Sequence, residues 1–216
     1  MAIKIKIPSS LSDITLRQYK KYLKLEDSIQ DERFLNAKMI EIFCGVSLEK
    51  VMLLQVKDST EISNSISKIF EEKPILVKRF ELNEVEYGFQ PQLDELTLGE
   101  YIDLDTFIGD WDNMEKAMNV LYRPIIVKLK EKYNIDKYVL GNEGALLDMP
   151  MSAVLSSIFF LWNLGLDLSK VMTDYLEEGE TIALTQYLAS EKNGVGINQF
   201  IHSLKEMLED LKISLN

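Results

Sequence analysis

Acidic side chains are the first residues in this sequence that could do chemistry. Carboxylates close together can bind a divalent cation, and four aspartates are grouped in this way: Asp103, Asp105, Asp110 and Asp112. A helix-loop-helix calcium site needs oxygen ligands at its first, third and fifth positions and glycine at its sixth. Counted from Asp103, the fifth position is Phe107 and the twelfth is Met114. The pattern fails, so we expect solvated acids at helix ends and no metal site.

Nucleophiles and general bases are scarce. His202 is the only histidine and Cys44 the only cysteine, so a catalytic triad, an intramolecular disulfide and a paired-cysteine metal site all lack partners. Gly194-Val195-Gly196 is too short for a phosphate loop, and no lysine with serine or threonine follows it. We predict no catalytic residues, no cofactor and no enzymatic activity.

The charge balance argues against nucleic acid and anionic membranes as partners. The chain has 35 acidic and 24 basic residues and a net charge of -11, which repels phosphate groups. One basic stretch is either the solvated side of a helix or a small binding face: Arg17, Lys20, Lys21 and Lys24.

The apolar run from Ala153 to Leu166 is shorter than the roughly 20 residues that a bilayer span needs, and it predicts a buried helix. The N-terminus lacks the apolar core of a signal peptide, which favours synthesis in the cytoplasm.

Helices dominate the N-terminal part. Thr15 and Gln18 have the spacing of a capping box, and Ile14 and Tyr19 that of a hydrophobic staple, which predicts a helix from Thr15 to about Leu25. Apolar residues then recur at helical spacing up to Gly45, where a second helix should end. A short third helix follows from Ser47, and a fourth from about 59 to 72.

The hydrophobic period then changes from helical to alternating. Alternating apolar residues flank Asn83-Glu84, which predicts a β-hairpin at about 77–90 with a two-residue loop. The N-terminus, Ile3-Lys4-Ile5-Lys6-Ile7, also alternates and predicts a strand. We expect this strand to pair with the hairpin. The fold class is therefore mainly α with a small antiparallel sheet (α+β), a helical bundle beside a hairpin.

One helix start occurs twice. Glu95-Leu96-Thr97-Leu98-Gly99-Glu100-Tyr101 repeats the arrangement of Asp13-Ile14-Thr15-Leu16-Arg17-Gln18-Tyr19, with cap, staple and capping-box partner in the same register. The repeat indicates either a duplicated unit or two helix starts that converged on good capping chemistry.

The domain organisation follows from the remaining patterns. Residues 1–132 form one α+β domain, in which a helix from near Asn113 should bend at Pro124 and continue to Leu129. Residues 133–150 contain two glycines and a proline and are expected as a linker or loop. Residues 151–216 form a C-terminal helical region packed on the first domain. Its helices are expected at about 151–164, 167–178, 180–191 and 197–213.

Protein contacts remain as the way in which this chain could act. Aromatic and arginine side chains often dominate interfaces, and four such residues are candidates: Trp111, Tyr122, Arg123 and Trp162. For each of them the alternative is a place in the core or at its boundary.

Two stretches resemble known phage proteins. The apolar helix, the break Cys44-Gly45-Val46-Ser47 and the helices up to Phe70 resemble tail assembly chaperones of tailed bacteriophages. The stretches Val85–Phe89, Leu96–Leu104 and Leu121-Tyr122-Arg123-Pro124 are similar to virion-associated proteins of large tailed phages, including crAss-like phages. Together they span roughly residues 10–125.

The resemblance implies a minor structural protein of the virion, near the portal vertex or capsid. It would be present in several copies and would bind other phage virion proteins (portal, capsid or tail components). Two alternatives stay open: a tail assembly chaperone that is not retained in the virion, and an enzyme or regulator that uses the acidic group near Asp103 with a divalent cation.

Overall fold

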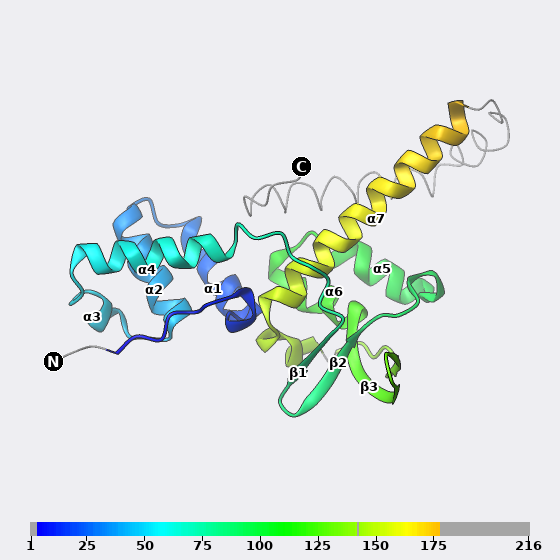
Figure 1. Cartoon of the computed structure of the whole chain (residues 1–216), viewed down its shortest axis with the longest axis horizontal. Coiled ribbons are helices and arrows are strands. Elements are labelled where there is room, and N and C mark those ends of the chain that lie inside the picture. The colour runs from blue at the N-terminus through cyan, green and yellow to red at the C-terminus, as the bar shows by residue number, and fades with distance from the viewer. Residues whose placement is uncertain (1–3, 142, 178–216) are drawn as a thin grey trace.

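The computed structural model describes residues 4–141 and 143–177. It combines α-helices with a four-stranded antiparallel sheet, and this confirms the α+β class. The first four helices lie at one end of the molecule, and the sheet lies at the other end with the later helices (Figure 1).

The N-terminal helices follow the capping signals. They are α1 (Leu16–Glu26), α2 (Glu32–Cys44), α3 (Leu48–Val51) and α4 (Val56–Ile69), preceded by the 3-10 turn η1 (Leu11–Asp13). The backbone N–H of Thr15 donates to Oε1 of Gln18 at 2.9 Å, and the Thr15 side chain accepts from the backbone N–H of Gln18, so the capping box is confirmed. Gly45 ends α2 at φ 64°, a conformation that glycine adopts without steric cost.

The predicted hairpin is also confirmed. It consists of β1 (Arg79–Leu82) and β2 (Val85–Phe89), joined by Asn83 and Glu84 at φ 51° and 64°. Two successive left-handed residues are typical of a type I′ turn, whose twist matches that of the flanking strands. The ring of Phe80 stacks on that of Tyr87 across the two strands, with centroids 5.5 Å apart.

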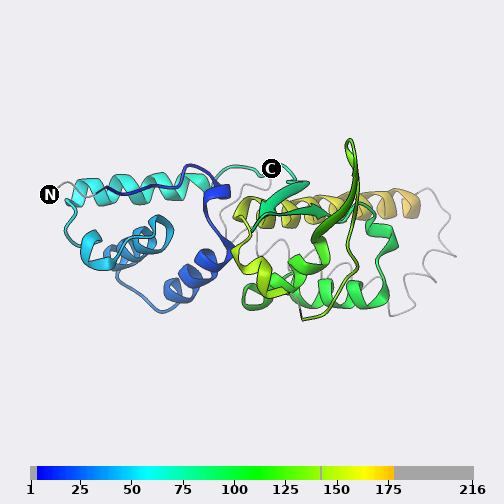
Figure 2. The ribbon, with the colours of Figure 1, turned by 90° about the horizontal axis from the view of Figure 1, so that it is seen from below.

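The sheet is completed by different strands from the one expected. Its order is β1-β2-β3-β4, where β3 is Tyr122–Leu129 and β4 is Lys132–Ile135. Residues 4–7 form no strand, so the expected pairing of the N-terminus with the hairpin is wrong. The segment leads from η1 along α4, away from the sheet (Figures 1 and 2). The Asp13 carboxylate accepts hydrogen bonds from the backbone N–H groups of Ser9 and Ser10, which fixes this direction.

The expected helix through Pro124 is wrong as well. After α5 (Leu98–Phe107), helix α6 (Met114–Leu121) ends where β3 begins, and Pro124 lies inside the strand opposite Tyr87. A proline disfavours the helical conformation of the residue before it and lacks a hydrogen-bond donor. The β-branched residues that follow Pro124 favour a strand.

The stretch 133–150, expected as a linker or loop, contains part of β4 and the 3-10 turn η4 (Glu143–Asp148). Leu146 and Met149 are buried. The backbone N–H of Leu16 donates to the carbonyl of Met149 at 3.0 Å, and that of Met151 donates to the carbonyl of Ile14 at 2.8 Å. This stretch therefore joins the start of α1 to the last described helix.

That helix, α7 (Met151–Glu177), is continuous where two helices at 151–164 and 167–178 were expected. An isolated glycine such as Gly165 costs a helix only about 1 kcal/mol, too little to end one whose first turns are buried in the core. The helices expected at 180–191 and 197–213, with His202 and Gly194-Val195-Gly196, lie outside the described residues. Within residues 4–141 and 143–177, no helix is long and apolar enough to cross a membrane.

Tyr122 lies at the centre of the core. Its side chain is fully buried, and its hydroxyl donates to the carbonyls of Val77 and Ala153 at 2.7 and 3.3 Å. The rings of Phe80 and Phe89 meet it edge-on, with centroids 5.2 and 5.3 Å away. Tyr122 thus joins the sheet to α7 and orients β3 for the contacts described below.

The ring of Tyr133 lies so close to Gly88 that it leaves no room for a side chain at this position. A Cβ atom there would lie 2.5 Å from Cε2 of Tyr133, whose hydroxyl donates to the carbonyls of Lys78 and Phe89. We expect Gly88→Ala to lower the unfolding free energy by about 1–3 kcal/mol, because the ring cannot move without breaking these bonds. Chemical denaturation measures this. The same substitution in a Tyr133→Ala background should cost much less, and equal costs in the two backgrounds would contradict the clash.

Candidate protein-interaction surface

Three of the four candidate interface residues are buried. Tyr122, Arg123 and Trp162 have exposed fractions of 0%, 6% and 6%. Tyr122 and Arg123 start a central strand, and Trp162 lies on the inner side of α7, so they have almost no surface to offer a partner. Trp111 is half-buried, and its ring lies edge-on to that of Tyr19 with centroids 4.9 Å apart. The four side chains do not form one site.

Three of the four basic residues of the α1 stretch form ion pairs within the chain, and the fourth, Lys21, is exposed. Arg17 pairs with Asp148 at 2.7 Å, and Lys24 with Asp112 at 2.8 Å. Lys20 pairs with the Glu115 carboxylate, and both side chains are largely buried. These pairs hold α1 against η4, α6 and the 3-10 turn η3 (Trp111–Asn113). Their positive charges are therefore already engaged by acids of the same chain, which favours the structural interpretation of the basic stretch.

Three of the four aspartates singled out in the sequence have separate tasks, and Asp112 is the partner of Lys24 described above. Asp110 caps η3 by accepting from the backbone N–H of Asp112 at 2.9 Å. Asp103 accepts from the hydroxyl of Tyr138 at 2.6 Å. In the part of the chain that the structure describes, no group of three or more metal-ligating side chains could hold an ion.

A buried ion pair holds α5 against the sheet. Nη1 of Arg123 lies 2.8 Å from Oε1 of Glu100, and their side chains are 8% and 5% exposed. The second oxygen of Glu100 accepts from the backbone N–H and the hydroxyl of Thr97 at 2.8 and 2.7 Å. Glu100 therefore caps α5 and binds β3 at once. Nε of Arg123 has no hydrogen-bond partner although it is buried, so this arginine depends on Glu100.

The surroundings of Glu100 shift its pKa in opposite directions. Burial raises the pKa, but the hydrogen bonds from Thr97 and the charge of Arg123 outweigh it, and the pKa lies below its ordinary value. A carboxyl whose pKa is lower in the folded state stabilises that state above its unfolded pKa, about 4.3. This contribution to stability is lost as the pH falls through the pKa that Glu100 has in the folded state.

The pH dependence gives a second testable prediction. Since glutamine does not titrate, the stability difference between the native protein and Glu100→Gln should be largest at neutral pH. It should shrink as the pH falls below about 4.3. Urea denaturation at a series of pH values measures both proteins, and the other acids contribute equally to each. A difference that stays constant down to the lowest pH at which both fold would contradict the assignment.

The outer face of α5 is apolar and exposed. Leu98, Tyr101 and Ile102 are 75%, 49% and 51% exposed and lie at i, i+3 and i+4, so they share one side of the helix. We call these three residues the α5 face. The equivalent residues of the first repeat, Leu16 and Tyr19, are 0% and 6% exposed. The same motif thus supplies core residues in α1 and surface residues in α5. Contiguous exposed apolar side chains are characteristic of surfaces that contact other proteins.

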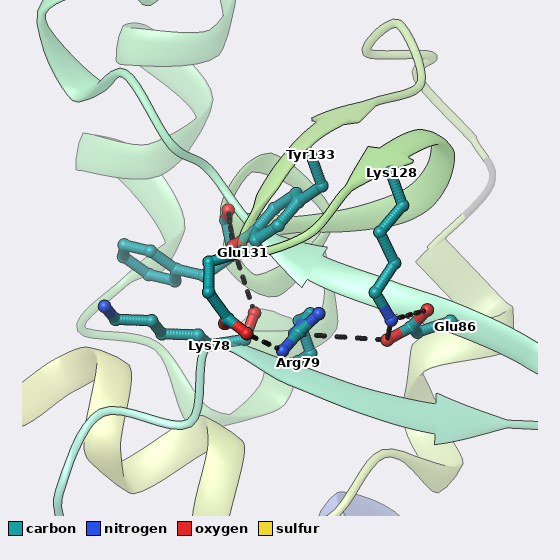
Figure 3. Close-up of polar contacts among 7 residues, drawn as sticks. Lys78, Arg79, Glu86, Lys128, Glu131 and Tyr133 are labelled. Atoms are coloured by element: carbon teal, nitrogen blue, oxygen red, sulfur yellow. Dashed lines mark hydrogen bonds and ion pairs between the residues drawn. The ribbon is translucent and has the colours of Figure 1, made fainter.

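Charged side chains cover the outer side of the sheet (Figure 3). Arg79 lies between the carboxylates of Glu86 and Glu131, at 4.0 and 3.3 Å, and Lys128 binds Glu86 at 2.7 Å. These side chains neutralise one another's charges in ion pairs that link β1, β2 and β3. The sheet can therefore keep a solvated polar side while its opposite side packs against α7.

Sequence reasoning missed the α5 face, although its spacing carried the signal. Leu98, Tyr101 and Ile102 have the helical period of a buried stripe, and only the packing of α5 shows that the stripe points outward. Comparison with protein-family models, curated proteins and solved structures gives no match. The α5 face and its support by Glu100 and Arg123 are therefore the basis for assigning a function.

Proposed function

We propose that this chain is a structural component of a tailed-bacteriophage virion, present in several copies and acting through contacts with portal, capsid or tail proteins. The observation that carries the proposal is the α5 face, an exposed apolar side of a helix that the buried Glu100–Arg123 pair holds against the sheet. The stretch Leu96–Leu104, which resembles virion-associated proteins, contains this face. A permanent interface of this kind is the ordinary use of such a surface.

A role without catalysis agrees with the contacts of the acids and bases that the sequence singles out. The basic residues Arg17, Lys20 and Lys24 are bound to carboxylates, and Asp103 and Asp110 hold hydrogen bonds that fix local structure. Each is satisfied by a neighbour that positions an element. We therefore propose that these side chains serve the fold, which in turn presents the α5 face.

Mass spectrometry of purified particles tests the proposal. We expect this chain at a fixed stoichiometry with portal and capsid proteins, through repeated washing at high salt, because an apolar contact is not screened by ions. Particles that lack the chain would overturn the proposal.

A tail assembly chaperone is the second candidate, favoured by another exposed apolar group. Met52, Leu53 and Val56 are 66%, 76% and 82% exposed and lie where α3 leads into α4. We call them the α3–α4 corner. The corner falls within the stretch that resembles tail assembly chaperones, and a chaperone needs exposed apolar side chains to hold an unassembled subunit. Recovery of the chain with free tail subunits, together with its absence from particles, would favour this candidate.

A further inference from the structure

The outer edge of β1 is free to accept another strand. The backbone N–H of Phe89 donates to the carbonyl of Lys78 at 2.8 Å, so Lys78 is a hydrogen-bonded position of the hairpin. In an antiparallel pair such positions alternate, and Phe80 and Leu82 therefore also bond to β2. The backbone groups of Arg79 and Glu81 point the other way, toward the edge. The sheet order places no strand beyond β1 within the described residues.

A groove runs beside this edge. It has a volume of about 360 Å³ and lies between β1 and residues of η1 and of the N-terminal ends of α1 and α7, among them Ser12, Thr15 and Pro150. The half-buried side chains of Phe80 and Leu82 line it, and Glu81 stands exposed at its rim. An occupant must therefore offer backbone donors and acceptors, two apolar side chains and a positive charge.

The segment Lys4–Ile7 of this same chain has these properties. Lys4 and Lys6 are exposed and Ile7 is 40% exposed, whereas Ile5 is half-buried against the core of its own chain and must leave it to enter the groove. Its alternation puts both lysines on one side and Ile5 and Ile7 on the other. In its own chain the hydrogen bonds of Ser9 and Ser10 to Asp13 direct this segment along α4 and away from β1 (Figure 2).

We propose that Lys4–Ile7 of a second copy adds as an antiparallel strand to β1, with Lys6 opposite Glu81. This register sets Ile5 beside Leu82 and Ile7 beside Phe80, and it brings Lys4 to the turn that carries Glu84. A parallel strand with the same Lys6–Glu81 pair would instead set Lys4 against Arg79, a like-charge contact that is unfavourable. Strand addition of this kind draws its affinity from main-chain hydrogen bonds and its specificity from alternate side chains. The inference deepens the proposed function, since it rests on the chain acting in several copies.

Cysteine cross-linking between copies tests the register. In a Cys44→Ser background, one preparation carries Lys6→Cys and the other Glu81→Cys, and the two are mixed under mild oxidation. Opposite residues of a hydrogen-bonded antiparallel pair have Cα atoms about 5.5 Å apart, within the range that a disulfide spans. We expect a disulfide-linked heterodimer to form at least tenfold faster than in a matched mixture of Lys6→Cys with Asp105→Cys, an exposed acid on α5. Equal rates in the two mixtures would overturn the proposal.

Two further measurements decide between occupants. A single chain with both Lys6→Cys and Glu81→Cys, oxidised at high dilution, should stay reduced; a rapid intrachain bond would mean that the groove takes its own segment and would overturn the proposal. We expect sedimentation to detect self-association of the native chain, Lys6→Glu to abolish it, and Glu81→Lys in the same chain to restore it. Failure of the restoring variant would also count against this register. None of these results depends on particles, so the strand could fail while mass spectrometry still finds the chain in virions.

Discussion

Replacing Arg123 with leucine should lower the free energy of unfolding by about 3–5 kcal/mol, because the carboxylate of Glu100 would be left buried without its partner. Both side chains are less than a tenth exposed, and their oxygen and nitrogen atoms are 2.8 Å apart. The loss should be visible as a lower urea midpoint with an unchanged slope. The stability of α5 against β3 would thus be shown to depend on this contact.

The double variant Glu100→Gln with Arg123→Leu provides the decisive comparison. Removing both charges should restore most of the loss, since the cost comes from the unpaired charge and not from the absence of the pair. Arg17→Leu is the matched control, because Arg17 also binds a carboxylate but is 56% exposed. It should cost less than about 1 kcal/mol. Similar losses for Arg17→Leu and Arg123→Leu would mean that burial does not set the energy of the pair.

Replacing Leu98 and Ile102 with serine should remove the chain from particles and leave its fold intact. Substitutions at exposed positions usually change stability by less than about 0.5 kcal/mol. Central apolar residues of an interface often contribute 2 kcal/mol or more, which is about a thirtyfold loss of affinity. The variant and the native chain, tagged differently and expressed together during infection, compete for the same positions. We expect the variant-to-native ratio in particles to fall at least tenfold.

The α3–α4 corner supplies the control for this experiment. Met52 and Val56 are 66% and 82% exposed, against 75% and 51% for Leu98 and Ile102, so their replacement with serine changes the apolar surface by a similar amount. If the α5 face is the interface, this control variant should enter particles normally. Exclusion of the control variant, with normal incorporation of the α5 variant, would transfer the assignment to the corner.

Local chemistry explains which elements could be predicted from the sequence. The capping box of Thr15, the left-handed end of α2 at Gly45 and the turn at Asn83-Glu84 each depend on residues within a few positions of one another. Their side chains satisfy or permit a particular backbone geometry wherever they occur. The helices and the hairpin that they bound are accordingly where the patterns indicated.

The strand pairings depended on partners that no local pattern specifies. An alternating segment can join any free edge, and the N-terminal segment had the correct alternation but the wrong location. In β3 the apolar residues after Leu121 fit a helix as well as a strand, and pairing with β2 decides between them. Tyr122 and Arg123 are an aromatic residue and an arginine, types that indicate an interface, but both lie in a central strand and are buried in the core.

The α5 face shows the same limit within the candidate site. The motifs Thr15–Tyr19 and Thr97–Tyr101 make the same capping contacts, but Tyr19 is buried against Trp111 and Tyr101 is half exposed. Capping determines where a helix begins; the surrounding elements determine which side of it meets solvent. The location of Glu100 was therefore predictable, whereas the exposure of its neighbours was not.

The contacts between the start of α1 and the end of η4 have a consequence for synthesis on the ribosome. Arg17 and Asp148 are 131 residues apart, and the adjoining backbone bonds join the same two regions. At roughly 5–20 residues per second, α1 must wait about 7–26 s after its own translation before its binding site emerges. Ile14 and Leu16, which become fully buried, are exposed on the nascent chain during this interval. We therefore expect slow codons before residue 148 to increase aggregation, and slow codons after it to have little effect.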